Sequence, residues 1–238
     1  MKKTSERGDA GAELFGLSNV VKVIVTLAVL VGAFAALSGR WNWWAGWTFL
    51  LVFGLYSVTL SVWLSRVDPG LARERAHDAD ERNQPYERVL LPVMVMLEIG
   101  LLVVAALDGG RFGWSHVPAW ARAGGWMALT AGGAMLPWVF RTNTFASGVG
   151  RIQANRGHAV VSSGPYRFVR HPMYTAIIGV MLGLPLALGS WWALIPGGLL
   201  ALLFVVRTAL EDRMLRDELP GYLAYTRRTR YRLIPGIW

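Results

Sequence analysis

The sequence predicts an all-α polytopic membrane protein: a helical bundle of about six transmembrane helices, or five if one segment does not span. Hydrophobic residues occupy 54% of the 238 positions, whereas charged residues occupy only 16%. Since soluble domains average about 25% charged residues, this chain has too little polar surface to cover a water-soluble globule. The apolar residues also fall in long blocks, which is the pattern of membrane helices.

The first four blocks lie at 18–37, 44–64, 89–107 and 120–140. Each is long enough to cross a hydrocarbon core of about 30 Å as a helix. We therefore divide the chain into two regions. Residues 1–140 hold four N-terminal membrane helices with a charged loop at 65–88, and residues 141–238 form a second region with a different pattern.

The second region contains two shorter blocks, 173–188 and 191–206, separated by Gly189 and Ser190. A rise of 1.5 Å per residue gives each block a length of about 24 Å. Two short helices joined by a Gly-Ser turn predict a tight helical hairpin. Pro185 and Pro196 are candidates for kinks in its two arms.

The basic residues predict how the bundle is oriented. The N-terminal tail, the loops 65–88 and 141–172, and the segment from 207 onward carry nearly all of the Lys and Arg. The connections between these regions hold only Arg40 and Arg111, with Arg122 beside them. The positive-inside rule then places both termini and the two long loops in the cytoplasm. We expect a multi-pass protein of a bacterial-type inner membrane.

Several function classes are excluded or disfavoured. The chain has 0 Cys, which excludes disulfides, Cys-ligated zinc, iron–sulfur clusters and thiol nucleophiles. It contains no P-loop, HExxH, GxSxG or GxGxxG pattern. The arginines are divided among several loops, which disfavours a nucleic-acid site. We predict no metal site and no nucleic-acid partner.

Two charged features outside the second region have open interpretations. The loop 65–88 mixes five Arg with six acidic residues, which is typical of a solvated connector. Glu98 lies at the centre of an apolar block. An ionisable group at that depth is a candidate functional residue, but a carboxyl paired with a neighbouring helix is equally compatible with the sequence.

The strongest local signal is the segment 164–174, GPYRFVRHPMY, immediately before the hairpin. Pro172 suits the first turn of a helix, so Arg170 and His171 stand beside free backbone N–H groups that can hold an anionic group. A basic-aromatic segment flanking the membrane is the alternative. A second polar cluster begins with Arg207 and Glu211, which are four residues apart and share one helical face.

An antiparallel hairpin brings the start of its first arm and the end of its second arm to the same side of the membrane. His171, Tyr174, Arg207 and Glu211 should therefore converge at one cytoplasmic entrance. A surface ion pair between Arg207 and Glu211 would be the simpler interpretation. It does not account for the polar cluster at the other arm.

These motifs resemble those of the isoprenylcysteine carboxyl methyltransferase and phospholipid N-methyltransferase family of integral membrane methyltransferases. The resemblance covers about residues 141–238. Its motifs are Gln153, Gly164-Pro165-Tyr166, Arg170 to Tyr174, Arg207 with Glu211-Asp212, Tyr222, Tyr225 and the segment 231–236. Two positions depart from the family pattern. Asp212 stands where the family often has Glu, and Ala176 stands where it often has Gly.

The resemblance implies S-adenosyl-L-methionine as cofactor, bound in a cytoplasm-facing pocket formed by a C-terminal segment. Arg207, with Arg170, is implied as catalytic: Arg207 orients the acceptor, while Arg170 and His171 help to hold the cofactor carboxylate. The implied cofactor-binding residues are Gln153, His158, Ala159, Val160, Val161, Tyr166, His171, Pro172, Met173, Tyr174 and Glu211.

We therefore expect an S-adenosylmethionine-dependent methyltransferase that modifies a lipophilic or lipid-anchored acceptor at the cytoplasmic membrane interface. Carboxylate O-methylation is favoured and phospholipid amine N-methylation is possible. The expected partners are the bilayer and the lipid acceptor, and the oligomeric state is left open. Two alternatives are an NADPH-dependent membrane reductase of the sterol-reductase type and a non-enzymatic transporter, in which Glu98 would be the best candidate residue.

Overall fold

The computed structural model describes residues 21–22, 24–76 and 84–238, and the secondary structure of these residues is helical without strands. The early part of the predicted block at 18–37 and the N-terminal basic residues lie outside this range. The described elements are a helix over Ile24–Ser38, α2 (Trp44–Val67), α3 (Pro69–Ala76), α4 (Glu87–Ala105), the π-helical η1 (Ala106–Phe112), α5 (Ala119–Thr142), the 3₁₀ turns η2 (Ala154–Arg156) and η3 (Gly164–Arg167), α6 (Pro172–Leu188), α7 (Leu194–Glu218) and α8 (Tyr222–Arg228).

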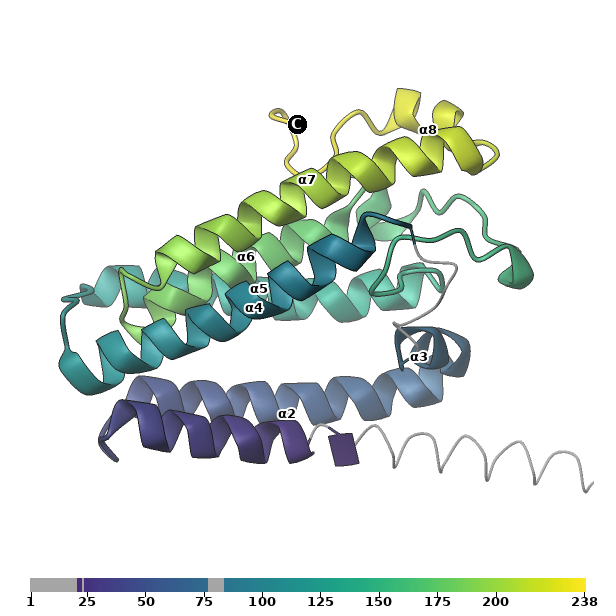
Figure 1. The fold of residues 1–238 in the computed structure, drawn as a ribbon. Coiled ribbons are helices and arrows are strands. Elements are labelled where there is room, and N and C mark those ends of the chain that lie inside the picture. The colour runs from purple at the N-terminus through teal and green to yellow at the C-terminus, as the bar shows by residue number, and fades with distance from the viewer. Residues whose placement is uncertain (1–20, 23, 77–83) are drawn as a thin grey trace, which may run out of the picture.

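Long apolar helices confirm the predicted helical membrane protein. Three stretches are long and apolar enough to cross a bilayer: Trp44–Val67, Glu87–Phe112 and Leu194–Glu218. Ile24–Ser38 and α6 are apolar but shorter. Figure 1 shows α4, α5, α6 and α7 packed in one bundle, with α2 along its edge. The count of six spans and the orientation stay predictions.

α6 and α7 form the predicted hairpin. Gly189 ends α6 in the left-handed region at φ +81°, which L side chains rarely adopt. The Ser190 hydroxyl donates to Asp108 of η1 at 2.5 Å, and the backbone N–H and hydroxyl of Ser115 donate to the same carboxylate. Asp108 is fully buried, so this end of the hairpin is fixed to α4 through η1.

The second arm of the hairpin differs from the prediction. It begins at Leu194 and continues past 206 to Glu218, because residues 207–218 are good helix formers and no Gly or Pro interrupts them before Pro220. Pro196 lies in the first turn of α7, where its missing N–H has no intrahelical acceptor to lose. The extension carries Arg207 and Glu211 on one continuous helix.

Close packing of small residues joins α5 to α6. A Cβ on Gly125 would lie 2.6 Å from the carbonyl oxygen of Gly183, and a Cβ on Gly132 would lie 2.9 Å from that of Ala176. Such contacts are typical of membrane helices, whose backbones approach at small residues and gain van der Waals contact. Because α6 carries part of the site, this contact also positions the site.

The charged loop does not match the expected solvated connector. α2 continues to Val67, α3 occupies part of the loop, and Asp68 accepts a hydrogen bond from the Leu71 N–H at 2.8 Å. Glu74 forms an ion pair with Arg151, and Glu87 at the start of α4 is 1% exposed. That interpretation was wrong for these residues, because their charges meet partners that come from distant segments.

Candidate functional site

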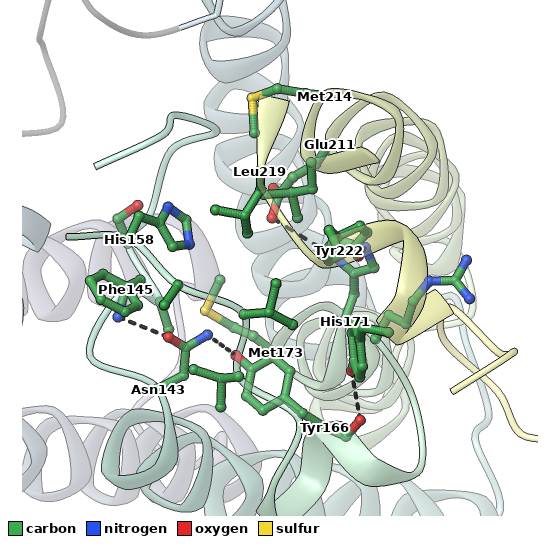
Figure 2. A pocket seen from close by; sticks show the side chains of 18 of the residues that line it. Asn143, Phe145, His158, Tyr166, His171, Met173, Glu211, Met214, Leu219 and Tyr222 are labelled. Atoms are coloured by element: carbon green, nitrogen blue, oxygen red, sulfur yellow. Dashed lines mark hydrogen bonds and ion pairs between the residues drawn. The ribbon is translucent and has the colours of Figure 1, made fainter. Parts of the chain in front are cut away.

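A cavity lies at the open end of the hairpin, the end where α6 begins and α7 extends beyond it. Its cavity volume is about 80 Å³, and the cavity is open to solvent on one side. Its walls come from the start of α6, the second half of α7, α8, and the segment between α5 and η3. In Figure 2, Asn143 and Phe145 lie across the cavity from His171 and Tyr222.

One wall of the cavity is built around Glu211 of α7. The Tyr174 hydroxyl donates to its Oε2 at 2.5 Å, and Nδ1 of His171 lies 3.7 Å from its Oε1. The His171 and Tyr174 rings stack in parallel, with centroids 5.9 Å apart. Apart from His171, no basic side chain of the described residues lies within ion-pair distance of Glu211. The cavity therefore contains a carboxylate without a fixed cationic partner.

Asp212, the next residue, has the opposite environment. It is fully buried and accepts hydrogen bonds from Arg170, Tyr222 and Arg232, at 2.7, 3.1 and 3.0 Å for the shortest of each. Arg216 of the same helix also lies 3.1 Å away. The carboxylate thus fixes the base of the cavity to the C-terminal segment, and its charge is already compensated by protein groups.

The C-terminal segment pairs with the entry to α6. The N–H groups of Arg170 and His171 donate to the carbonyls of Tyr231 and Arg232, both at 2.9 Å. The Arg170 Nη1 also donates to the carbonyls of Thr229 and Arg230. Arg170 lines the cavity, but these bonds and Asp212 occupy most of its N–H groups. Its geometry favours a positioning role over direct chemistry.

The opposite wall comes from the segment after α5. Asn143 donates to the Tyr166 hydroxyl at 2.9 Å, and the Tyr225 hydroxyl donates to the Tyr166 carbonyl at 2.6 Å. Phe145 stacks on the His158 ring at 4.6 Å between centroids. Burial lowers the pKa of His158 and raises the pKa of Tyr225 to about 12. This wall therefore presents aromatic faces and neutral polar groups, together with Arg151, which is paired with Glu74.

Most of the residues implied as cofactor-binding meet at this one cavity. Those that line it are His158, Ala159, Val160, Val161, Tyr166, His171, Met173, Tyr174 and Glu211. Gln153 and Pro172 do not line it. Gln153 is 2% exposed and donates to the Phe145 carbonyl at 2.9 Å while accepting from Arg156, so it organises the loop behind the wall. Pro172 occupies the first position of α6.

The sequence did not identify all of the lining residues. Asn143 and Phe145 were missed because they lie just after a membrane helix in a stretch without a recognisable motif. Tyr222 and Tyr225 were noted only as part of the resemblance, although both line the cavity. An aromatic pair three residues apart on a short helix was the available signal, since that spacing puts both on one face.

Arg207 does not pair with Glu211. Its Nε and Nη2 donate to Oε1 of Glu87 at 3.1 and 2.8 Å, and Nη2 also donates to the Gly148 carbonyl at 2.5 Å. Its guanidinium carbon lies 5.3 Å from the Tyr174 ring centroid. Arg207 is 3% exposed and does not line the cavity itself. It is one layer behind the wall, in contact with Tyr174.

Glu98 lies on the outer surface of α4 and has no hydrogen-bond or ion-pair partner among the described residues. Among the described residues, Glu98 is therefore not paired with a neighbouring helix, which was one of its two interpretations. The described residues also contain no group of three or more His, Cys, Asp or Glu side chains arranged to hold a metal ion.

Apolar helices with a cavity at one end of the bundle define the class of this chain: a helical membrane protein with a candidate binding site. Residues 120–219 match the family model described as phospholipid methyltransferase. They include α5, η3, α6 and α7, which supply much of the cavity wall. This match agrees with the resemblance to membrane methyltransferases that the motifs indicate.

A curated relative matches a shorter stretch. The cobalt-zinc-cadmium resistance protein CzcN of Cupriavidus metallidurans is 37% identical over 84 residues. The matched stretch covers 33% of this chain and 37% of the relative, so the similarity spans little more than a third of the relative's length.

Proposed function

We propose that this protein is an S-adenosyl-L-methionine-dependent methyltransferase that modifies a lipophilic acceptor where the hairpin cavity meets the membrane. The observation that supports this most directly is Glu211, a carboxylate in the cavity with no arginine or lysine of the described residues within ion-pair distance. The segment that carries it, residues 120–219, also matches the phospholipid methyltransferase family model.

The cavity's donor set fits the proposed cofactor. S-adenosylmethionine carries a positively charged ammonium group, and Glu211 is an anionic acceptor for it. The first N–H groups of α6, at Met173 and Tyr174, precede any intrahelical acceptor and suit a carboxylate. The stacked pair of Phe145 and His158 provides an aromatic face for a planar base.

Each wall then has a role in holding the reactants. When bound, S-adenosylmethionine supplies an activated methyl group, whose transfer breaks one C–S bond and forms one bond to the acceptor. Glu211 holds a cationic or hydroxyl group, and Tyr174 orients that carboxylate through its hydrogen bond. Asp212 and Arg170 keep the base of the cavity rigid. Catalysis by alignment needs no nucleophilic side chain, which agrees with a chain without cysteine.

The acceptor reaches the cavity from the bilayer side. α7 combines an apolar half with a polar half, and Arg207 stands where the two meet. An amphiphilic acceptor can keep its tail among apolar helices while its head group approaches Tyr174. The sequence-based interpretation gave Arg207 the role of orienting the acceptor head group. In the structure its guanidinium is already paired with Glu87.

Equilibrium binding to the detergent-purified protein tests the proposal against the reductase alternative. We expect saturable binding of S-adenosylmethionine and no comparable binding of NADPH. Glu211→Gln should weaken the cofactor affinity by about tenfold, or about 1.4 kcal/mol. Glu218→Gln is the matched control, because Glu218 lies on the exposed surface of the same helix. Binding of NADPH alone, or wild-type affinity of Glu211→Gln, would contradict the proposal.

A further inference from the structure

A groove lined by arginines lies outside the cavity, where η3 meets the C-terminal segment. Its volume is about 270 Å³, and it is open to solvent. Arg167, Arg228 and Arg230 line it, and all three are exposed. Phe168 and Tyr231 also line it, and the Arg167 guanidinium carbon lies 4.5 Å from the centroid of the Phe168 ring. This arginine groove therefore combines three cationic groups with two aromatic rings.

The positive charge of the arginine groove is not compensated by the protein. Residues 220–238 contain four Arg and no Asp or Glu, and residues 109–210 also lack acidic residues. Asp212, which lies between these two ranges, is fully buried and already paired with arginines that do not line the groove. No carboxylate of the described residues lies within ion-pair distance of the three groove arginines. The groove therefore suits an anion.

The C-terminal segment that carries the groove lies against the apolar bundle. Leu233 is buried in the same core cluster as Tyr174 of α6, and its carbonyl accepts a hydrogen bond from the Thr175 hydroxyl at 2.8 Å. Figure 1 shows the chain returning from α8 and ending beside α7. Next to this contact, Ile234 and Ile237 are exposed. Exposed apolar side chains beside arginines are typical of a surface at the membrane interface.

The same two chain segments supply the groove and the cavity, but through different residues. Tyr166 and Tyr225 line the cavity, whereas Arg167 and Arg228, one and three residues later, line the groove. Among the described residues that line them, none is shared. The Tyr225 hydroxyl joins the two segments by donating to the Tyr166 carbonyl at 2.6 Å. A ligand of the groove would therefore rest on a preformed surface and be distinct from a ligand of the cavity.

We propose that the arginine groove binds the phosphate of an anionic phospholipid from the surrounding leaflet, as a docking ligand that is not the methyl acceptor. A guanidinium group binds phosphate oxygens through two parallel N–H donors, and three such groups line this groove. Phe168 and Ile234 offer apolar contact to the start of the acyl chains, which a soluble phosphate lacks. The cytoplasmic leaflet, where the arginines place this segment, attracts basic clusters through its anionic lipids. The inference does not depend on the proposed methyltransferase function.

Binding of two lipids with the same acyl chains tests the proposal: dioleoyl phosphatidylglycerol, which is anionic, and dioleoyl phosphatidylcholine, which is zwitterionic. Native mass spectrometry of the detergent-purified protein without cofactor measures both affinities. Phosphatidylglycerol carries neither an amine nor a carboxylate, so it belongs to neither acceptor class considered above. We expect it to bind at least about tenfold more tightly than phosphatidylcholine. Glycerol 3-phosphate, which has the phosphate without the acyl chains, should bind at least about tenfold more weakly than phosphatidylglycerol.

Two triple variants with the same change in net charge test the place of binding. The groove variant combines Arg167→Gln, Arg228→Gln and Arg230→Gln. The matched control changes three exposed arginines on α2, α5 and α7: Arg66→Gln, Arg141→Gln and Arg213→Gln. The groove variant should lose about tenfold in affinity for phosphatidylglycerol and with it the preference over phosphatidylcholine, whereas the control should change by less than about threefold.

Neighbouring residues of α8 provide a second comparison, which decides alone if the groove variant does not fold. Arg228 lines the groove and Arg227 does not, although both are exposed. Arg228→Gln should weaken phosphatidylglycerol binding about threefold, and Arg227→Gln should leave it unchanged. In the cavity, Glu211→Gln should also leave this affinity unchanged, because the proposed lipid site lies outside the cavity.

Equal binding of the two lipids by the wild-type protein would overturn the proposal. So would equal losses in the two triple variants, or in Arg227→Gln and Arg228→Gln, because the groove would then have no special role. Glycerol 3-phosphate that binds as tightly as phosphatidylglycerol would make the groove a site for a soluble phosphate compound and contradict the lipid assignment. A tenfold loss in Glu211→Gln would place the lipid in the cavity instead. Failure to bind S-adenosylmethionine would contradict only the proposed methyltransferase function.

Discussion

The hydroxyl of Tyr174 donates a 2.5 Å hydrogen bond to Oε2 of Glu211, and this bond joins the two arms of the hairpin at the cavity wall. Tyr174 is 2% exposed, stacks in parallel with His171, and carries the Arg207 guanidinium 5.3 Å from its ring centroid. One side chain therefore contacts both the carboxylate proposed to bind the cofactor and the arginine held by Glu87.

Removing this hydroxyl should weaken cofactor binding without unfolding the protein. In Tyr174→Phe the Glu211 carboxylate loses its one fixed donor and is free to rotate. A hydrogen bond to a charged group contributes about 1.5–3 kcal/mol, so we expect the dissociation constant for S-adenosylmethionine to rise about tenfold or more. Isothermal titration calorimetry measures it, with Tyr231→Phe as the control. An unchanged constant would show that Tyr174 does not act through Glu211.

Asp212 should be needed for folding more than for binding. Asp212→Asn removes the charge that compensates Arg170 and Arg232 in a buried place, and breaking such a pair typically destabilises by about 3–5 kcal/mol. Thermal unfolding in detergent should show a clear loss. Asp217→Asn changes an exposed carboxylate on the same helix, 68% exposed and 3.9 Å from Arg213, and should shift stability by less than about 1 kcal/mol. Equal effects would contradict the central role of Asp212.

The contact between α5 and α6 allows a comparison of two glycines on one helix. A Cβ at Gly183 would lie 2.7 Å from the Ala128 Cβ and 2.9 Å from the Gly125 carbonyl, whereas a Cβ at Gly179 would meet nothing within 4 Å. Gly183→Ala should separate the helices and lower the unfolding temperature. Gly179→Ala should be neutral or stabilise by up to about 1 kcal/mol, because Ala is the better helix former. Similar unfolding temperatures for both variants would mean that the bundle tolerates a larger distance between α5 and α6.

The meeting of His171, Tyr174 and Glu211 could be predicted because it depends on local rules. Apolar blocks mark the two arms, Gly189 marks the turn, and an antiparallel pair of helices then brings the ends together. The environment of Arg207 could not be predicted in this way. Glu211 is four residues away on the same helix, yet the partner is Glu87, 120 residues distant in the sequence.

Two further differences have the same origin. The sequence showed Asp212 as part of a motif and as a departure from the family pattern, whereas the structure brings Arg170, Tyr222 and Arg232 to it from separate segments. The apolar block of α7 ended at 206, although the helix continues to Glu218, because hydropathy detects contact with lipid and not helical geometry. Charged residues that pair across long sequence distances do not recur at a regular spacing, so periodicity in the sequence does not reveal them.

His158 predicts a pH dependence of the cavity wall. Burial is the main cause of its lowered pKa, so the folded protein holds fewer protons at this ring than the unfolded chain does at pH values below about 6.5. Folding stability should therefore fall as the pH decreases from that value toward the lowered pKa. His158→Gln should remove this part of the dependence. The unfolding temperature between pH 7.5 and 5 measures the effect, and the same slope in both proteins would exclude His158 as its source.

The orientation of the hairpin follows from the distribution of arginines and can be tested directly, because the chain has no cysteine of its own. The segment that carries Asn155 should face the cytoplasm, whereas the turn that carries Trp192 should face the other side. Both residues are exposed, and Trp192 is 55% exposed. In intact spheroplasts a membrane-impermeant maleimide should label the Trp192→Cys variant and should label Asn155→Cys only after permeabilisation. The reverse labelling pattern would mean that the bundle has the opposite orientation and that the cavity does not face the cytoplasm, where the cofactor is supplied. Labelling of both variants in intact spheroplasts would contradict a hairpin that spans the membrane.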